Sequence, residues 1–422
     1  MLYKKFLISY LTMILILFLI LALFKCNIVF AENTGLERKI NSVQEYEYSN
    51  YEYDADDLND SEYISYNEYI DSGMGFNFRS ITPNRESVET AHLEYEIYSL
   101  PKTWVIQKSY ITSTYVYTVQ VNPSNNVDVW ISRCRINGTN ATYQDHMILQ
   151  NCGHNQGFEL YNYGGKTYFW VLCKPCEYHK YKTPTQLGRV RYVAGSVISN
   201  YTQITRFSNL NCANRTATSF GPVYRVDAAL SSDNSKVLLA VRSYEFLGDP
   251  NSTSDVNNIE KYRSKDLQYS YYDSETLNEV LDDIEKDATT NYVSFKNNIT
   301  LKNACEFSYV QRQGNLMLPQ GSCQGVEFTN AQSIYIAGNR SVSGANSNSS
   351  INTDPQIAKL TKSNNTYIYS SCVNIVGISF RAEIEGLQLK NDKLYFIITK
   401  YPDLDGDGRT IHSVYSIPKS SF

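Results

Sequence analysis

A short strand–turn–strand pattern recurs along this chain of 422 residues and restricts its fold more than any other feature. In the clearest copy, Gly325–Gly338, an apolar–polar–apolar strand start is followed by a turn-rich break and a strongly apolar strand. The pattern predicts two adjacent antiparallel strands joined by a tight hairpin. Further copies, the last two less regular, are Gly157–Leu172, Gly386–Ile398, Thr118–Ile131 and Asp227–Ala240.

The recurrence of this hairpin predicts a β-propeller. A hairpin alone is only marginally stable in water, so several copies must bury their apolar faces against each other. The copies are separated by tens of residues, as expected for propeller blades with insertions. We therefore predict an all-β fold, a β-propeller of about five blades, formed by residues 88–422.

One segment departs from the strand pattern. Ser274–Asp287 begins at a cap residue, Asp273 or Ser274, and has an acidic first turn that suits the helix dipole. Its apolar residues recur at helical spacing, namely Leu277, Val280, Leu281 and Ile284. This spacing predicts one peripheral α-helix that packs on the outside of a blade.

Residues 1–31 have the features of a secretory signal peptide. Lys4 and Lys5 form a basic start, Phe6–Phe24 is a long apolar run, and Val29 and Ala31 offer small residues at a cleavage site. We therefore predict a secreted, extracellular protein. Because the apolar run is long enough to span a bilayer, an uncleaved membrane anchor is the alternative.

Residues 32–87 differ in composition from the rest of the chain. Within them, residues 42–72 include ten acidic and no basic residues, many tyrosines and few aliphatic residues. Such a segment cannot offset its ordering entropy by forming a core, so we predict a disordered leader or linker. A solvated spacer, a pro-segment and an adhesive tail are all compatible with this composition.

The charge balance argues against nucleic acid as a partner. The chain has a formal net charge of −5, but most of it comes from the acidic segment, and the body that follows is close to neutral with no basic stripe. The 36 tyrosines suit strand faces and contact surfaces, because each has a large apolar body and a polar tip.

Eight of the nine cysteines follow the predicted signal peptide, and an even number in an oxidising compartment indicates disulfides. They are Cys134, Cys152, Cys173, Cys176, Cys212, Cys305, Cys323 and Cys372. We expect the pairs Cys134–Cys152 and Cys305–Cys323 first, since both flank hairpin-like segments. Alternatively, Cys173, Cys176 and His179 have the spacing of three zinc ligands, although no fourth ligand completes the set.

Polar residues at equivalent places in the hairpins form a candidate binding site. Glu159, Glu327 and Gln388 occupy the third place of a Gly–apolar–Glu/Gln–apolar strand start, and Gln120 occupies the same place in the Thr118 copy. If these strands are the innermost of their blades, their side chains converge near the central channel, where they suit a cation, water or a polar ligand. The alternative is a polar ring that only sets the register of the blades.

His154 and Gln156, which precede the strand that contains Glu159, extend this candidate site, although a lone histidine is more often structural. No nucleophile–base or metal-protease signature is present, so the sequence does not indicate an enzyme. A glycosidase places its carboxylates through the fold rather than through sequence spacing. Glu159 and Glu327 therefore stay as weak candidates for catalytic acids.

Residues 403–409 have the start of a calcium-binding loop. Asp403, Asp405 and Asp407 alternate before Gly408 in a pattern that suits oxygen coordination of a hard cation. The twelfth place is Val414 rather than the bidentate glutamate of a complete loop. Calcium is thus a possible cofactor, and a plain Asp/Gly hairpin turn is the alternative.

Several stretches occur in a characteristic order along the chain, namely Gly153–Leu160 (GHNQGFEL), Thr185–Tyr192, Phe207–Asn211, Phe220–Ala240, Tyr271–Lys286, Gln324–Gly338, Glu383–Lys400 and His412–Lys419. In this order they resemble the helveticin J family of large bacteriocins. The likeness covers Tyr115–Ser420, and no single motif is diagnostic. The eight cysteines and the acidic segment depart from what this resemblance leads us to expect.

The resemblance implies a secreted antimicrobial protein that kills related Gram-positive bacteria, and it supplies no catalytic residues. Our leading hypothesis is a bacteriocin that binds a target-cell envelope component, a glycan or a surface protein, through loops at one propeller face. The alternatives are a surface lectin or adhesin that does not kill, and a cell-wall glycan hydrolase.

Overall fold

The computed structural model describes residues 83–287, 289–313, 317–338, 354–378, 382–400 and 410–422. These residues belong to one compact unit, Val43–Phe422. The predicted signal peptide or anchor and almost all of the predicted acidic leader lie outside the described residues. Among the helices that are described, none has both the length and the apolar character needed to cross a membrane.

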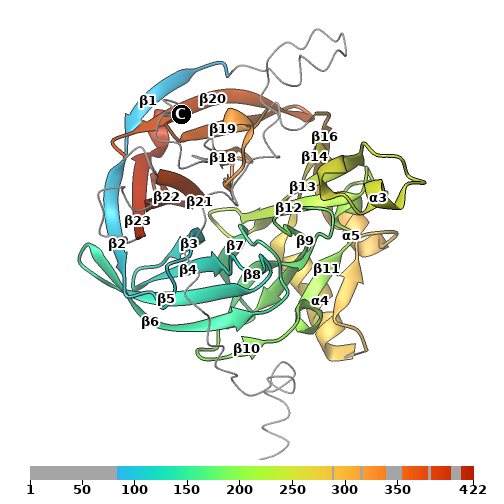
Figure 1. Cartoon of the computed structure of the whole chain (residues 1–422), viewed down its shortest axis with the longest axis horizontal. Helices are drawn as coiled ribbons and strands as arrows, with labels where there is room; N and C mark the ends of the chain where they lie inside the picture. Colours follow the sequence, from blue (N-terminus) through green and yellow to red (C-terminus); the bar gives the residue numbers. More distant parts are fainter. Residues whose placement is uncertain (1–82, 288, 314–316, 339–353, 379–381, 401–409) are drawn as a thin grey trace, which may run out of the picture. The chain divides into compact units, whose positions relative to one another are not determined.

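Five four-stranded antiparallel blades are arranged around a common centre (Figure 1). The first blade comprises β3 (Ile106–Ile111), β4 (Tyr115–Val121), β5 (Val129–Asn137) and β6 (Asn140–Leu149), and the second comprises β7 (Phe158–Tyr163), β8 (Lys166–Pro175), β9 (Pro184–Val190) and β11 (Thr205–Ser208). The third comprises β12 (Val223–Leu230), β13 (Lys236–Phe246), β14 (Tyr262–Asp273) and β16 (Cys305–Gln311). The fourth comprises β17 (Gly325–Phe328), β18 (Ile334–Gly338), β19 (Gln356–Ser363) and β20 (Thr366–Val376), and the fifth β21 (Ala382–Lys390), β22 (Lys393–Lys400), β23 (Ile411–Pro418) and β2 (His92–Tyr98).

The first strands of the described chain close the ring. β2 pairs antiparallel with β23 and parallel with β6, which joins the fifth blade to the first. β1 (Glu86–Thr90) adds a parallel outer strand to β20 of the fourth blade. The remaining short strands, β10 (Val197–Ile198) and β15 (Tyr292–Ser294), pair in parallel with β6 and β11. The structure thus confirms the all-β propeller prediction.

Four of the five predicted hairpins pair the inner strand of a blade with its neighbour: β7–β8, β12–β13, β17–β18 and β21–β22. The fifth predicted hairpin also forms, but it is not the inner hairpin of its blade. Thr118–Ile131 covers β4 and β5, which are the second and third strands of the first blade. Its inner hairpin is β3–β4, one strand earlier.

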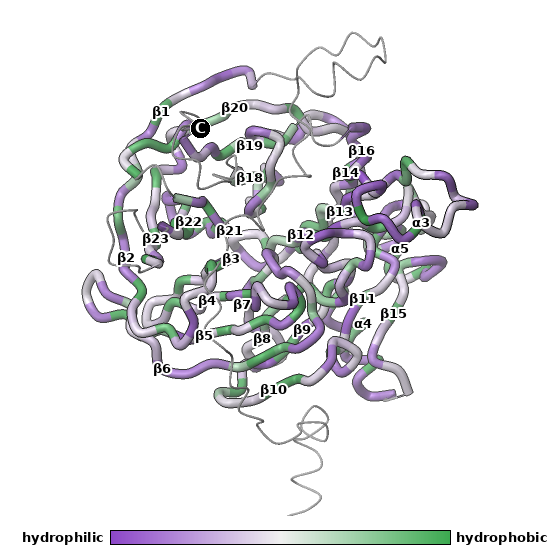
Figure 2. Tube along the Cα trace, viewed as in Figure 1, coloured by the Kyte–Doolittle hydropathy of each residue, from purple (hydrophilic) through white to green (hydrophobic). Residues whose placement is uncertain are grey.

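The hydrophobic core lies between neighbouring blades. One cluster of buried side chains joins the second and third blades and includes Trp170, Phe207 and Leu239. Equivalent clusters join the third to the fourth, the fourth to the fifth and the fifth to the first blade. Figure 2 shows apolar stretches alternating with polar ones along the strands of the blades. Burial between blades explains why single hairpins of this chain need their neighbours.

The predicted peripheral helix is confirmed as α4 (Ser274–Asp287), which packs outside the second and third blades. Asp273 is its cap, because its Oδ1 accepts the N–H of Thr276 at 2.8 Å. Leu277 and Leu281 are fully buried. The other described helices are short: α3 (Thr253–Val256), α5 (Ile299–Ala304), and the 3-10 turns η3 (Tyr201–Gln203), η4 (Leu210–Cys212), η5 (Ile259–Lys261), η7 (Pro319–Gly321) and η8 (Lys419–Ser421).

The disulfide prediction is not borne out in this structure, where all eight cysteines from Cys134 onward are free and buried. Cys305 belongs to the core cluster between the second and third blades, whereas Cys323 belongs to the cluster between the third and fourth. The two thiols therefore serve as small apolar side chains in separate cores. Burial also raises the pKa of the Cys134 thiol to about 12, which disfavours the reactive thiolate.

His412, buried in β23, should make the fold sensitive to acid. Burial lowers the pKa of its imidazole to about 4, whereas an unfolded histidine titrates near 6.5. As the pH falls from about 6.5 to about 4, the unfolded chain takes up a proton that the folded chain refuses, so about 3 kcal/mol of stability is lost. Urea unfolding of His412→Gln should lack this part of the acid dependence.

An exposed histidine, His92, provides the matched control, since His92→Gln leaves the buried imidazole in place. An acid dependence of His412→Gln identical to that of the wild type would contradict the assignment.

Candidate functional site at the propeller centre

The inner strands β3, β7, β12 and β21 surround the centre of the ring in Figure 1. Polar side chains in the first half of the inner strands, or just before these strands, form a group that we call the upper tier, with one member from each blade. These residues, Gln107, Gln156, Arg225, Gln324 and Glu385, are mostly buried. Such an arrangement requires closed blades, because the members lie up to 278 positions apart in the sequence.

Gln156 forms hydrogen bonds with all four other residues of this upper tier. Its Nε2 donates to Oε1 of Gln107 at 3.0 Å, to Oε1 of Gln324 at 3.1 Å and to Oε2 of Glu385 at 3.3 Å. Its own Oε1 accepts a hydrogen bond from Nη2 of Arg225. One amide thus links all five blades, and a buried network of this kind favours a single arrangement of its members.

A lower tier consists of charged residues that are almost fully buried. Nζ of Lys108, on β3, forms an ion pair with Glu159 of β7. On β12, Asp227 accepts two hydrogen bonds from Arg225, at 2.9 and 3.0 Å. Glu327, on β17, accepts the backbone N–H of Phe328 at 3.0 Å, while its Oε2 is buried without a hydrogen-bond partner among the described residues.

Burial and neighbouring charges shift the pKa values of the two glutamates in the lower tier to different extents. Burial and the neighbouring Glu159 carboxylate raise the pKa of Glu327 well above its usual range. Burial also raises the pKa of Glu159, and Lys108 opposes that rise. Burial disfavours the charge on Lys108, yet Glu159, Glu327 and Asp227 together raise the pKa of its ammonium group. Burial and like charge thus favour the neutral form of Glu327, whereas Lys108 favours the ionised form of Glu159.

Two glycines allow the inner strands to approach closely enough for these contacts. A Cβ on Gly386 would lie 2.6 Å from Cα of Lys108, and a Cβ on Gly325 would lie 2.7 Å from Cα of Gly386. Gly386 also has φ +39, a conformation that side chains disfavour. Its N–H donates to the carbonyl of Gln324 at 2.9 Å, which joins the fifth and fourth blades.

The structure brings together several predicted site residues and separates others. Glu159, Glu327 and Gln156 lie in the two tiers, and Nε2 of His154 contacts Oε1 of Gln107 at 2.8 Å. Gln388 instead pairs with the backbone of Ile111, through contacts of 2.7 and 3.2 Å, and holds β21 against β3.

The interpretation of Gln120 as a central residue is wrong. It lies on β4, and its Nε2 donates to the carbonyls of Lys102 and Trp104. The physical reason is that the Thr118 copy begins on β4, the second strand of the first blade, whereas the interpretation took its first strand as the innermost one.

Sequence reasoning missed six of the nine residues of the two tiers, namely Gln107, Lys108, Arg225, Asp227, Gln324 and Glu385. The available signal was the presence of charged residues within apolar strands, as in Ile106–Ile111 (IQKSYI) and Val223–Leu230 (VYRVDAAL). Charged residues are almost never fully buried unless they are paired. Their presence in apolar strands therefore indicates partners from another blade.

The metal predictions gain no support. Asp403, Asp405 and Asp407 lie outside the described residues, so the calcium prediction stays untested. Within the described ranges, no group of three or more His, Cys, Asp or Glu side chains is arranged to hold a metal ion. Nδ1 of His179, from the alternative zinc set, accepts the backbone N–H of Tyr181 at 3.1 Å.

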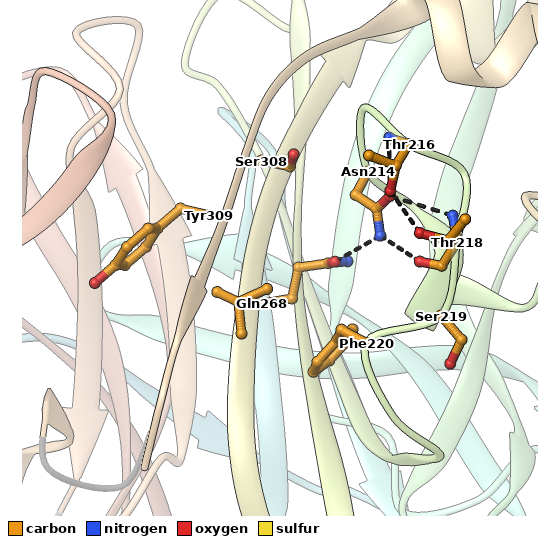
Figure 3. Close-up of a pocket in the computed structure, with 9 residues that line it drawn as sticks. Asn214, Thr216, Thr218, Ser219, Phe220, Gln268, Ser308 and Tyr309 are labelled. Atoms are coloured by element: carbon orange, nitrogen blue, oxygen red, sulfur yellow. Dashed lines mark hydrogen bonds between the residues drawn. The ribbon is translucent and has the colours of Figure 1, made fainter.

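A small hollow of about 200 Å³ lies beside the third blade, and its polar lining residues stabilise a loop rather than form a binding site (Figure 3). Nδ2 of Asn214 donates to the carbonyl of Thr218 at 2.8 Å and to Oε1 of Gln268 at 2.9 Å. Its Oδ1 accepts the hydroxyl of Thr216 at 2.7 Å. Because these polar groups satisfy one another, the hollow offers little to a ligand.

Comparisons with solved structures find weak likenesses. An exo-β-1,3-galactanase from Phanerochaete chrysosporium matches with a TM-score of 0.42 and 7% identity, over 79% of this chain and 65% of the galactanase chain. A GH43 endo-arabinanase from Bacillus licheniformis matches with a TM-score of 0.37 and 10% identity, over 75% of this chain and 95% of that one. A GH43_1 enzyme from Xanthomonas citri matches with a TM-score of 0.38 and 8% identity, over 78% and 89%. At these values the likeness carries no inference about activity.

The blades, their closure by β2 and the buried polar centre define a five-bladed β-propeller. A comparison with curated proteins finds no match. A family model described as "Bacteriocin helveticin-J" matches residues 84–420, which include every described blade. The chain therefore belongs to the helveticin J family, as its ordered motifs predict.

Proposed function

We propose that this protein is a secreted bacteriocin that binds a component of the Gram-positive cell envelope through one propeller face and kills the bound cell. The observation that carries the proposal is the family match over residues 84–420, which extends through all five blades. A match confined to one blade would support a shared fold unit only, whereas this one includes the ring closure and the centre.

The geometry favours the surface rather than the centre as the place of target contact. Gln156, Arg225 and Lys108 are buried and use their polar atoms on each other and on neighbouring blades. A buried network of this kind holds the blades together and leaves recognition to the loops and pockets around it.

Killing by the protein and its binding should be measured on the same cells. The test uses the mature chain, residues 32–422, with a fluorescent label, titrated onto a panel of Gram-positive cultures. We expect viable counts to fall with dose on strains that bind the label, and heating the protein to abolish both effects. Binding without killing would favour a lectin or adhesin, and neither effect on any strain would refute the proposal.

A cell-wall glycan hydrolase is the second candidate, because Glu159 and Glu327 interact at the centre and burial raises the pKa of both carboxyl groups. A raised pKa is typical of a catalytic acid, which must carry its proton to act. Glu327→Gln retains the shape of the neutral carboxyl group, so the fold should persist. If Glu327 is the catalytic acid, release of soluble sugar from purified cell walls should fall at least about a hundredfold in this variant.

Glu279→Gln, the same change at an exposed carboxylate on α4, is the matched control for handling and expression. Equal sugar release by wild type and Glu327→Gln, or release by neither, would eliminate the hydrolase. Killing that persists in Glu327→Gln would leave the bacteriocin proposal intact.

A further inference from the structure

A second hollow, of about 610 Å³, lies where the second blade meets the third. Its walls come from the ends of β8 and β9, from β11 and β15, and from the strands β12 and β13. The volume is within the range of small-molecule binding pockets. It is separate from the central network, because none of the nine residues of the two tiers lines it.

Arg206 lies in the wall of this pocket and is only 7% exposed. Its Nε donates to Oε1 of Gln186 at 2.7 Å. Its Nη1 lies 3.2 to 3.4 Å from backbone carbonyl oxygens of Thr202, Ile204 and Asn291. All these acceptors are neutral.

Among the residues that the structure describes, no carboxylate forms an ion pair with Arg206. A buried arginine is normally paired with an acid, because the bare charge is costly to remove from water. The other charged residues of the pocket, Lys174 and Glu177, are exposed and opposite in sign. The pocket therefore has a net positive charge whose buried part lacks an anion.

Tyrosines line the same pocket. The rings of Tyr201 and Tyr292 flank the Arg206 guanidinium, each with its centroid 5.2 Å away. Tyr178 is 38% exposed and stacks on Tyr262 with a centroid distance of 4.6 Å. Tyr292 is 48% exposed. Exposed tyrosines offer apolar ring faces and hydroxyl groups, a combination that suits the C–H faces and hydroxyls of a sugar or polyol.

We propose that this pocket binds an acidic sugar or polyol unit, with the phosphate or carboxylate at Arg206 and the carbon skeleton against the tyrosines. The inference rests on the proposed function and adds to it the class of envelope ligand and the place where it binds. Guanidinium groups form paired hydrogen bonds with both kinds of anion, so the chemistry common to both sources is the anion on a hydroxyl-rich skeleton.

Three sugars with the same ring test the inference: glucose 1-phosphate, glucuronic acid and glucose. Titration of each into the mature chain, followed by calorimetry or ligand-observed NMR, should give an affinity at least about tenfold higher for one of the anions than for glucose. Higher affinity for glucose 1-phosphate would indicate a sugar- or polyol-phosphate polymer as the natural ligand. Higher affinity for glucuronic acid would indicate an acidic saccharide. Equal affinities for all three sugars, or binding of none, would overturn the proposal.

Variants locate the binding. Arg206→Gln should abolish the preference for the anion, and Tyr292→Ala should weaken binding severalfold without disturbing the fold, because the ring is half exposed. Tyr98→Ala removes a tyrosine of similar exposure, 44%, from another blade and should bind like the wild type. If Arg206→Gln fails to fold, Tyr292→Ala decides, and unchanged binding by Tyr292→Ala would refute the site.

The cell assay separates this inference from the proposed function. A wild-type protein that kills, with an Arg206→Gln variant that folds and kills equally well, would overturn the pocket as the receptor site and leave the bacteriocin proposal standing. A wild-type protein that neither binds nor kills any strain would refute the proposed function, while the sugar titrations would still report on the pocket.

Discussion

Lys108→Met should lower the free energy of unfolding by about 3 to 5 kcal/mol, because it leaves the buried Glu159 without its cation. Lys108 also opposes the rise in the pKa of Glu327, so its loss removes a favourable charge interaction with both carboxyl groups. Urea unfolding monitored by tryptophan fluorescence would measure the difference, and the midpoint should shift at unchanged slope.

An exposed ion pair provides the control. Nζ of Lys265 lies 3.3 Å from Glu245, with side chains 51% and 35% exposed. Lys265→Met should cost about 1 kcal/mol or less. The double variant Lys108→Met/Glu159→Gln should recover part of the loss, because it leaves no uncompensated charge. Equal effects of the two single lysine variants would contradict the buried pair.

Gly386→Ala should destabilise the propeller by about 3 kcal/mol or more, since the new Cβ combines backbone strain with a clash. Its position lies 2.6 Å from Cα of Lys108, an atom that cannot move without shifting β3. Thermal unfolding followed by circular dichroism would measure the loss. The expected consequence is a looser contact between the fifth and first blades.

A glycine in a turn provides a control that distinguishes the effect of the steric clash from the effect of backbone strain. Gly165, in the β7–β8 hairpin, has φ +73, and a Cβ there would meet nothing within 4 Å. Gly165→Ala should therefore cost only the strain, about 1 kcal/mol. If both variants lose the same stability, close approach of the inner strands is not what requires glycine at position 386.

The buried centre connects these stability effects with the proposed function. Lys108, Gln156 and Arg225 couple blades that are distant in sequence, so the ring presents its loops in fixed relative positions. A pocket between two blades, such as the one around Arg206, keeps its shape only if those blades stay in place. We therefore expect variants at the centre to weaken target binding indirectly, through lowered stability.

Local patterning determined much of the fold. Alternation of apolar and polar residues with turn residues between the strands identified four inner hairpins, because strand periodicity and turn chemistry act over short distances. Helical spacing with a cap identified α4 at its observed bounds, Ser274–Asp287. The order of motifs also led to the helveticin J family, which the match over residues 84–420 confirms.

Tertiary structure alone decided which strands face the centre and which side chains meet there. The hairpins β3–β4 and β4–β5 have the same local alternation, so only packing against the other blades selects β3 as the inner strand. Lys108 and Glu159 come from different blades, as do Arg225 and Gln156, and no local pattern relates them. The eight cysteines after the predicted signal peptide likewise have an even count that permits disulfides, but the separate cores around Cys305 and Cys323 place these thiols apart. Partnerships between distant residues depend on the closed ring, because burial between blades rather than sequence spacing brings them together.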